Sequence, residues 1–82
     1  MRIIQAEEGM KMIEDYIMDV LSLEPFVGVH WIVAVTREAL DCTEDEVQDA
    51  IIRLEEQGRI KGFMLDGIPQ ISSTEVSWEA KE

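Results

Sequence analysis

The chain has 82 residues, of which 46% are hydrophobic and 30% are charged, a composition typical of one small globular domain and not of a disordered chain. Seven Lys and Arg stand against eighteen Asp and Glu, giving a formal net charge of −11. This charge repels nucleic acids and anionic lipids and favours basic partners. The single cysteine excludes an internal disulfide, and no apolar run reaches the length of about 18 residues that a membrane span needs. Acidic residues stand where a signal peptide would carry bases, so we expect a cytoplasmic protein.

The first predicted element is a helix from about Ala6 to Leu23. Glu7 and Glu8 lie in its first turn, where a helix N-terminus favours negative charge. Pro25 ends it, because the residue before a proline avoids helical dihedral angles. The residues expected on its buried side recur at helical spacing: Met10, Ile13, Tyr16, Ile17, Val20 and Leu21.

The next stretch, "FVGVHWIVAVTREAL", is dense in β-branched and aromatic residues, which favour a strand. Its second half instead follows the i, i+3, i+4, i+7, i+8 spacing of a helix, with Ile32, Val35, Thr36, Ala39 and Leu40. We therefore predict a short extended piece at Val27–Val29 and a second helix from about Trp31 to Leu40.

The third helix carries the clearest signals. Thr43 with Glu46 three residues later is a capping box, in which each side chain accepts from the other residue's amide. Gly58 provides a left-handed exit. Only Asp41 and Cys42 separate this helix from the second one. Its predicted buried stripe consists of Val47, Ala50, Ile51 and Leu54.

After Gly58 the sequence predicts a β-hairpin. Asp66-Gly67 lies between two apolar runs, which is the strongest short signal for such a turn. Pro69 fits only an edge or unpaired position of a sheet. The tail, residues 72–82, is polar and expected to be loose apart from Trp78.

This order of elements resembles the winged helix-turn-helix superfamily over roughly Met10 to Ser72. The resemblance is carried by "VTREAL-DC-TEDEVQDAIIRLEEQGRIKG", which matches a helix, an apolar turn residue, a Ser or Thr cap and a helix that ends in "L-x-x-L/E-x-x-G-x-I". Cys42 takes the turn position and Thr43 the cap. The resemblance implies one mainly α domain over residues 1–82, with three helices and a small β-hairpin wing. The superfamily includes DNA readers and protein adaptors, so fold alone does not choose a function.

In DNA-binding members of the superfamily the outer face of the third helix enters the major groove. Placing the predicted stripe inward turns outward three acids, one base and one isoleucine: Asp45, Asp49, Glu56, Arg53 and Ile52. DNA affinity comes largely from neutralised phosphates, so acids on this face oppose it. The five residues are instead candidates for a protein-binding patch, although a single exposed isoleucine is also ordinary on a protein surface.

A basic ridge is the alternative that would restore contact with DNA. Its candidate residues are Arg37, Gln48, Arg53, Arg59 and Lys61. Such bases more often pair with nearby acids, here Glu38, Glu55 and Glu56, in surface ion pairs worth roughly 0–1 kcal/mol. The hairpin tip, "LDGI", carries no base, unlike wings that enter a minor groove.

No catalytic, cofactor or metal signature is found in the sequence. His30 and Cys42 are too few for a zinc site, which needs about four ligands. They are the only conceivable base and nucleophile, and a thiol at the turn position is better explained as a buried small hydrophobe. Phosphate-loop, G-x-S-x-G and dinucleotide motifs are absent from the sequence. We expect a non-enzymatic protein without a cofactor.

The predicted helices carry more apolar residues than one small core can bury. Met12, Met18 and Leu23 fall outside the main stripe of the first helix, and Trp31 and Val33 outside that of the second. Methionine-rich surfaces are common at interfaces. The resemblance implies dimers formed through the first helix and a terminal segment, and with the surplus of Met12, Met18, Leu23 and Trp31 we expect a homodimer. Trp78, isolated in the polar tail, either folds back on the domain or anchors a partner, and it joins Met12, Met18 and Trp31 as a candidate for protein contact.

The sequence therefore favours a winged-helix adaptor or regulator that works by protein contacts in a transcription or other DNA-associated assembly. The main alternative is a dimeric DNA-binding transcriptional regulator that uses the basic ridge. A weaker alternative is an acidic mimic of DNA that occupies a nucleic-acid-binding protein.

Overall fold

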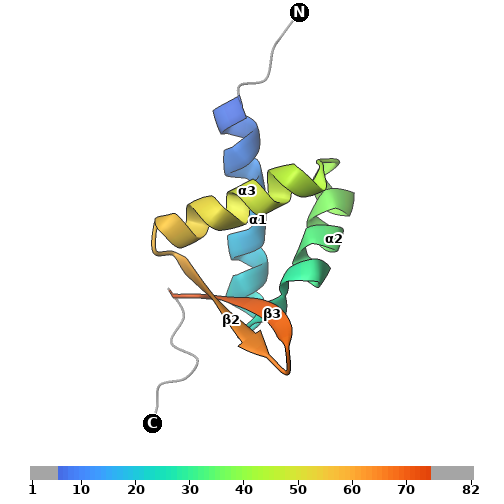
Figure 1. Cartoon of the computed structure of the whole chain (residues 1–82). Helices are drawn as coiled ribbons and strands as arrows, with labels where there is room; N and C mark the ends of the chain where they lie inside the picture. The colour runs from blue at the N-terminus through green and yellow to red at the C-terminus, as the bar shows by residue number, and fades with distance from the viewer. Residues whose placement is uncertain (1–5, 75–82) are drawn as a thin grey trace, which may run out of the picture.

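Three helices and a three-stranded antiparallel sheet make up the part of the chain that the computed structural model describes, residues 6–74 (Figure 1). The predicted order of helix, strand, helix, helix and hairpin is confirmed. The elements are α1 (Ala6–Leu23), β1 (Val27–Gly28), α2 (Val29–Leu40), α3 (Glu44–Glu56), β2 (Ile60–Leu65) and β3 (Ile68–Ser73).

The sheet has the order β1-β3-β2, so the hairpin of β2 and β3 is extended by a short third strand. β1 pairs with β3 at Val27↔Ile71 and Gly28↔Gln70. The extended piece predicted at Val27–Val29 is therefore a strand that ends one residue early, at Gly28. Through this pairing the segment after α1 is attached to the C-terminal half of the domain.

The predicted hairpin turn at Asp66-Gly67 is confirmed. Both residues have positive φ, 54° and 79°, as the two central positions of a type I′ turn require. Pro69 lies on the central strand, β3, directly before Gln70. Pairing of β3 with β1 ends at Gly28↔Gln70, so Pro69 has no partner residue on β1. Its missing N–H therefore leaves no pairing of the sheet unsatisfied, which is the situation expected for a proline in a strand.

α1 has the predicted bounds, but its buried side is wider than predicted. Ile13, Ile17 and Leu21 are buried as expected, and Met18, predicted to be surplus at the surface, is only 9% exposed. α1 packs against both other helices and against β3, so it needs a stripe broad enough to meet several neighbours. The assignment of Met18 to an exposed contact surface is wrong.

α2 begins at Val29, two residues before the predicted start, and ends at Leu40 as predicted. Ile32 and Thr36 are buried as expected. Val33, predicted to lie outside the stripe, is also buried, while Ala39 is exposed. The buried face of α2 therefore includes Val33 and leaves out Ala39, unlike the predicted stripe.

α3 follows its prediction closely. The Glu46 amide donates to Thr43 Oγ1 at 3.2 Å, and the Thr43 amide donates to Glu46 Oε1 at 2.9 Å, which completes the capping box. Gly58 has φ of 76°, the left-handed exit that its position predicted. The stripe of Val47, Ala50, Ile51 and Leu54 is buried in the common core.

The prediction that a loose tail begins at Ser72 is wrong for its first residues. Ser72 and Ser73 are buried and belong to β3, and the Thr74 amide donates to the Arg59 carbonyl at 2.9 Å. Backbone pairing with β2 continues through these polar residues, at Lys61↔Ser72 and Ile60↔Ser73, and extends the strand beyond the apolar run. Trp78 lies outside the described residues.

Cys42 lies in the link between α2 and α3, partly buried and packed against the core. Asp41 before it takes the left-handed conformation, with φ of 55°. The Cys42 thiol points toward the Thr36 carbonyl, with 3.8 Å between sulfur and oxygen. Burial, and next the negative charge of Glu46, raise the pKa of this thiol. The turn position is therefore apolar in character, as predicted, but not sealed from solvent.

We predict that the native thiol reacts more slowly with a maleimide at pH 8 than the thiol of the unfolded chain, because a raised pKa lowers the thiolate fraction. Cys42→Val should retain most of the stability, and Cys42→Ser should lower the free energy of unfolding by about 1 kcal/mol. Labelling as fast in the native as in the denatured protein would contradict this placement of the side chain.

The raised pKa of the Cys42 thiol also predicts that the stability of the protein depends on pH. The unfolded thiol ionises near its ordinary pKa of about 8.5, and the folded thiol ionises only at higher pH. The unfolded state therefore loses its proton first, and the free energy of unfolding falls as pH rises above about 8.5. Urea titrations of the parent chain and of Cys42→Val at several pH values should show a smaller fall in the variant.

Candidate protein-interaction surface

The outer face of α3 is exposed and carries more acids than bases. Its buried stripe faces the core, and this turns outward the residues Asp45, Gln48, Asp49, Ile52, Arg53 and Glu56, all of which are exposed. Ile52 is 50% exposed. The acids Glu44, Asp45 and Glu46 fill the first turn, where they complement the positive end of the helix dipole.

Arg53, the base on this face, is held by an acid of another helix. Arg53 Nε donates to Glu14 Oε2 at 2.9 Å, and the Glu14 side chain on α1 is only 9% exposed. The prediction that Arg53 pairs with acids near it in sequence, such as Glu56, is therefore wrong. Residues 39 positions apart meet here because α1 and α3 cross, which local spacing does not reveal.

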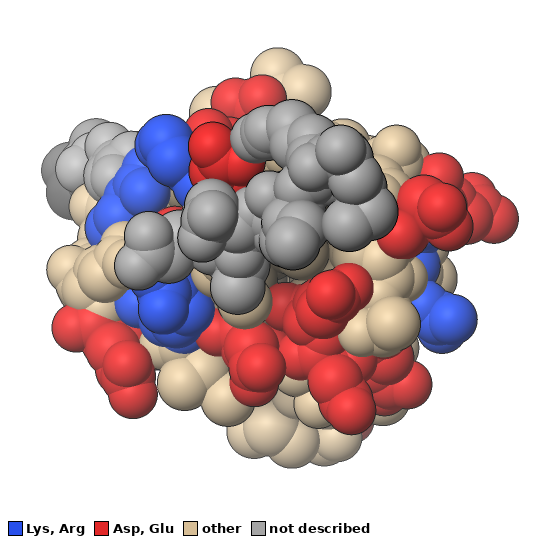
Figure 2. Space-filling model, turned by 90° about the horizontal axis from the view of Figure 1, so that it is seen from above, with Lys and Arg blue, Asp and Glu red and all other residues tan. Residues whose placement is uncertain are grey.

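The other basic candidates lie on separate elements. Arg37 is exposed in the last turn of α2, Lys61 is exposed on β2, and Arg59 is half-buried just before β2. Figure 2 shows acidic side chains predominating on one face, with Lys and Arg gathered at two separated places. The structure does not bring these bases onto the outer face of α3.

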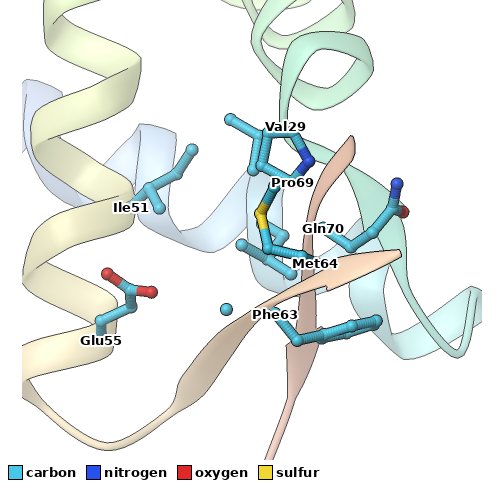
Figure 3. Close-up of a pocket in the computed structure, with 9 residues that line it drawn as sticks. Val29, Ile51, Glu55, Phe63, Met64, Pro69 and Gln70 are labelled. Atoms are coloured by element: carbon cyan, nitrogen blue, oxygen red, sulfur yellow. The ribbon is translucent and has the colours of Figure 1, made fainter. Parts of the chain in front are cut away.

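A groove of about 410 Å³ lies between α3 and the hairpin (Figure 3). Ile51 and Glu55 project into it from α3, and Val29 closes it at the start of α2. The hairpin side is lined by Gly62, Phe63, Met64, Pro69, Gln70 and Ile71. The groove is thus largely apolar, with the Glu55 carboxylate as its charged group.

Gly62 makes room for this carboxylate. A Cβ atom built at Gly62 would lie 2.8 Å from Glu55 Oε2, closer than real side chains allow. Glu55 is predicted from the sequence only as a partner for surface bases, and the groove is not predicted. One signal was present, because an isolated glycine inside an apolar strand often marks close approach of another group.

Besides Ile52 on α3, apolar side chains are exposed on α1, on α2 and on the hairpin. Met12, Leu23 and Trp31 are 59%, 82% and 52% exposed on α1 and α2. The hairpin adds Met64, Leu65 and Ile68, which are 63%, 43% and 53% exposed and are not among the residues predicted for protein contact. Met12 and Trp31 are thus available for contact, Met18 is not, and the homodimer stays a prediction.

His30 and Cys42 are not placed to act together. His30 is exposed in the first turn of α2, and Cys42 follows the last turn. They lie 12 positions apart at opposite ends of this helix, which at 1.5 Å per residue is a separation of roughly 18 Å. Within residues 6–74, no three His, Cys, Asp or Glu side chains are grouped so as to hold a metal ion, and no helix is long and apolar enough to cross a membrane.

Comparison with known proteins gives no relative: no protein-family model, curated protein or solved structure matches this chain.

The ion pair between Glu14 and Arg53 should contribute to the free energy of unfolding. Arg53→Met keeps the aliphatic stem but leaves a buried carboxylate without its donor, and we predict a loss of about 1–3 kcal/mol in the free energy of unfolding. Combining it with Glu14→Gln should cost less than the two single changes added together. Urea unfolding of the four chains measures this.

The matched control is the exposed pair of Lys11 and Asp15, 3.6 Å apart on α1. Lys11→Met should change stability by less than about 0.5 kcal/mol. Additive effects of the Glu14 and Arg53 substitutions would show that the pair does not join the two helices.

Proposed function

We propose that this chain is a winged-helix domain without catalytic activity, and that it serves as an adaptor or regulator in a transcription or other DNA-associated assembly by binding proteins. The order of its elements and the sheet order β1-β3-β2 support the winged-helix assignment. In such a domain α3 is the helix that DNA-binding relatives place in the major groove, and the hairpin is the wing.

The observation that carries the proposal is the charge of the outer face of α3. Asp45, Asp49 and Glu56 are exposed there, and the guanidinium of Arg53 is already bound to Glu14. Duplex DNA presents about one negative charge per 1.7 Å along its axis, so each of these acids would be pushed away from it. Carboxylates accept hydrogen bonds from cytosine only where cations hold the protein in place.

The exposed apolar residues favour a protein partner over DNA mimicry. An acidic mimic of DNA relies mainly on its pattern of charge, whereas exposed apolar side chains are typical of an ordinary protein interface. Here Ile52 stands among the acids of α3, and Met64, Leu65 and Ile68 are exposed on the neighbouring hairpin. Apolar residues within a polar rim are the usual anatomy of a protein interface.

We predict that the protein binds random duplex DNA more weakly than the usual non-specific range of about 10⁻⁴–10⁻⁶ M at physiological salt. Fluorescence anisotropy of a labelled duplex measures this binding over a series of salt concentrations. Submicromolar affinity that falls steeply with salt, and falls further in Arg37→Ala and Lys61→Ala, would instead establish the DNA-binding regulator.

A further inference from the structure

β2 forms an open edge of the sheet. In the order β1-β3-β2, one side of β2 pairs with β3 and the other pairs with no strand of the described chain. Met64 and Leu65 on β2 are exposed, and so is Gly62. Natural edge strands are usually blunted by charges, bulges or prolines, because an open edge is a template for another strand. Lys61 is the only charged residue of β2.

The register decides which backbone groups point outward. The two-residue turn makes Leu65↔Ile68 a hydrogen-bonded pair, and such pairs alternate along an antiparallel ladder. Every second residue of β2, counted back from Leu65, therefore bonds to β3. Arg59, six residues before Leu65, fits this series, because its carbonyl accepts a hydrogen bond from the Thr74 amide. The N–H and C=O groups of Gly62 and Met64 therefore face away from β3, and the described chain provides no hydrogen-bond partner for them.

Side chains opposite these two residues would face the groove. Gly62 and Met64 lie on the same face of the sheet as the groove between α3 and the hairpin, beside Glu55 and Ile51. Side chains directly opposite each other on paired strands have Cβ atoms about 4.5–5.5 Å apart. Since Glu55 Oε2 lies only 2.8 Å from where a Gly62 Cβ would be, a long cationic side chain opposite Gly62 would reach that carboxylate.

We propose that the β2 edge binds an extended segment of a partner protein as a fourth strand, with a Lys or Arg opposite Gly62 and apolar residues two positions to either side. The main-chain groups of Gly62 and Met64 bind its backbone, Glu55 binds the cation, and Met64 packs against an apolar side chain. This is the recognition mode of β-strand addition, in which backbone bonds give affinity and alternate side chains give specificity. The inference rests on the proposed function in protein binding.

Charge complementarity favours a basic segment over a second copy of the chain. The chain carries a formal charge of −11, and the groove contributes a carboxylate. Antiparallel pairing of two β2 strands about Gly62 would bring two Glu55 carboxylates onto the same face of the joined sheet. Like charges directly opposed on a sheet are destabilising.

The probe is a labelled, end-capped peptide, Thr-Val-Thr-Arg-Thr-Leu-Thr, in which Val, Arg and Leu share one face of a strand. A second peptide carries Gln in place of Arg. Anisotropy titrations should show that the parent protein binds the Arg peptide and that Glu55→Gln weakens this binding about tenfold, since it removes a charge-assisted hydrogen bond. The Gln peptide should bind both proteins equally weakly. Glu38→Gln, which removes one exposed acid of α2 away from the groove and is the matched control for net charge, should bind the Arg peptide like the parent.

Met64→Pro tests the backbone part of the proposal. By the register, the Met64 amide points outward, so a proline there removes a donor for the peptide without removing a ladder bond to β3. It should abolish peptide binding with an unchanged circular dichroism spectrum. In the parent protein, the Gly62 and Met64 amides should exchange hydrogen more slowly once the peptide is bound, a readout that holds even if Met64→Pro does not fold.

Three results would overturn the inference: no binding of the Arg peptide, equal binding by Glu55→Gln, or unchanged exchange at Gly62 and Met64 when the peptide binds. A parent dimer that Met64→Pro dissociates would assign the edge to a second copy and overturn it as well. Failure of the peptide with DNA binding still absent leaves the proposed function standing, whereas tight DNA binding defeats the proposed function whatever the peptide does.

Discussion

The rotational setting of α3 about its axis is the constraint on which the rest of this molecule depends. Val47, Ala50, Ile51 and Leu54 fix that setting, because all four must be buried against α1, α2 and the sheet. With those residues inward, the acids of the outer face point to solvent and Glu55 points to the hairpin. Rotation by one residue, about 100°, would bury a carboxylate without a partner, which costs several kcal/mol.

The hairpin register is the second constraint, and it depends on the turn at Asp66-Gly67. Side chains of a strand alternate between faces, so a slip by one residue would exchange the two faces of β2. Gly62 would leave the groove, and Lys61 or Phe63 would have to take the space that Glu55 fills. The turn at Asp66-Gly67, which is predicted from the sequence, therefore sets the register that leaves the groove open and points the amides of Gly62 and Met64 outward.

Much of this fold could be predicted from local signals. The capping box at Thr43, the glycine exit at Gly58 and the turn at Asp66-Gly67 each act within a few residues, and each is found where expected. Element ends decided by tertiary pairing were less predictable, as the buried serines that continue β3 to Ser73 show.

The candidate site was predictable only in part, because its main features join segments far apart in the chain. The exposed acids of α3 follow from the helical period alone. The bond between Arg53 and Glu14, the burial of Met18 and the approach of Glu55 to Gly62 depend on how α1, α3 and β2 pack together. The periodic pattern of a helix predicts the direction of its buried stripe but not the width of that stripe. The width depends on how many neighbouring elements the helix packs against.

The central claim is that the acids on the outer face of α3 keep this domain off DNA, and charge reversal tests it most directly. The variant Asp45→Lys, Asp49→Lys, Glu56→Lys keeps the buried stripe and changes only exposed positions. We predict that it binds random duplex DNA in the non-specific range of about 10⁻⁴–10⁻⁶ M, with affinity that falls as salt rises. A control with the same change in net charge reverses exposed acids of α1 and the residue after it: Asp15→Lys, Asp19→Lys and Glu24→Lys. The control should bind DNA more weakly than the α3 variant, whereas equal binding by the parent protein and the α3 variant would contradict the account.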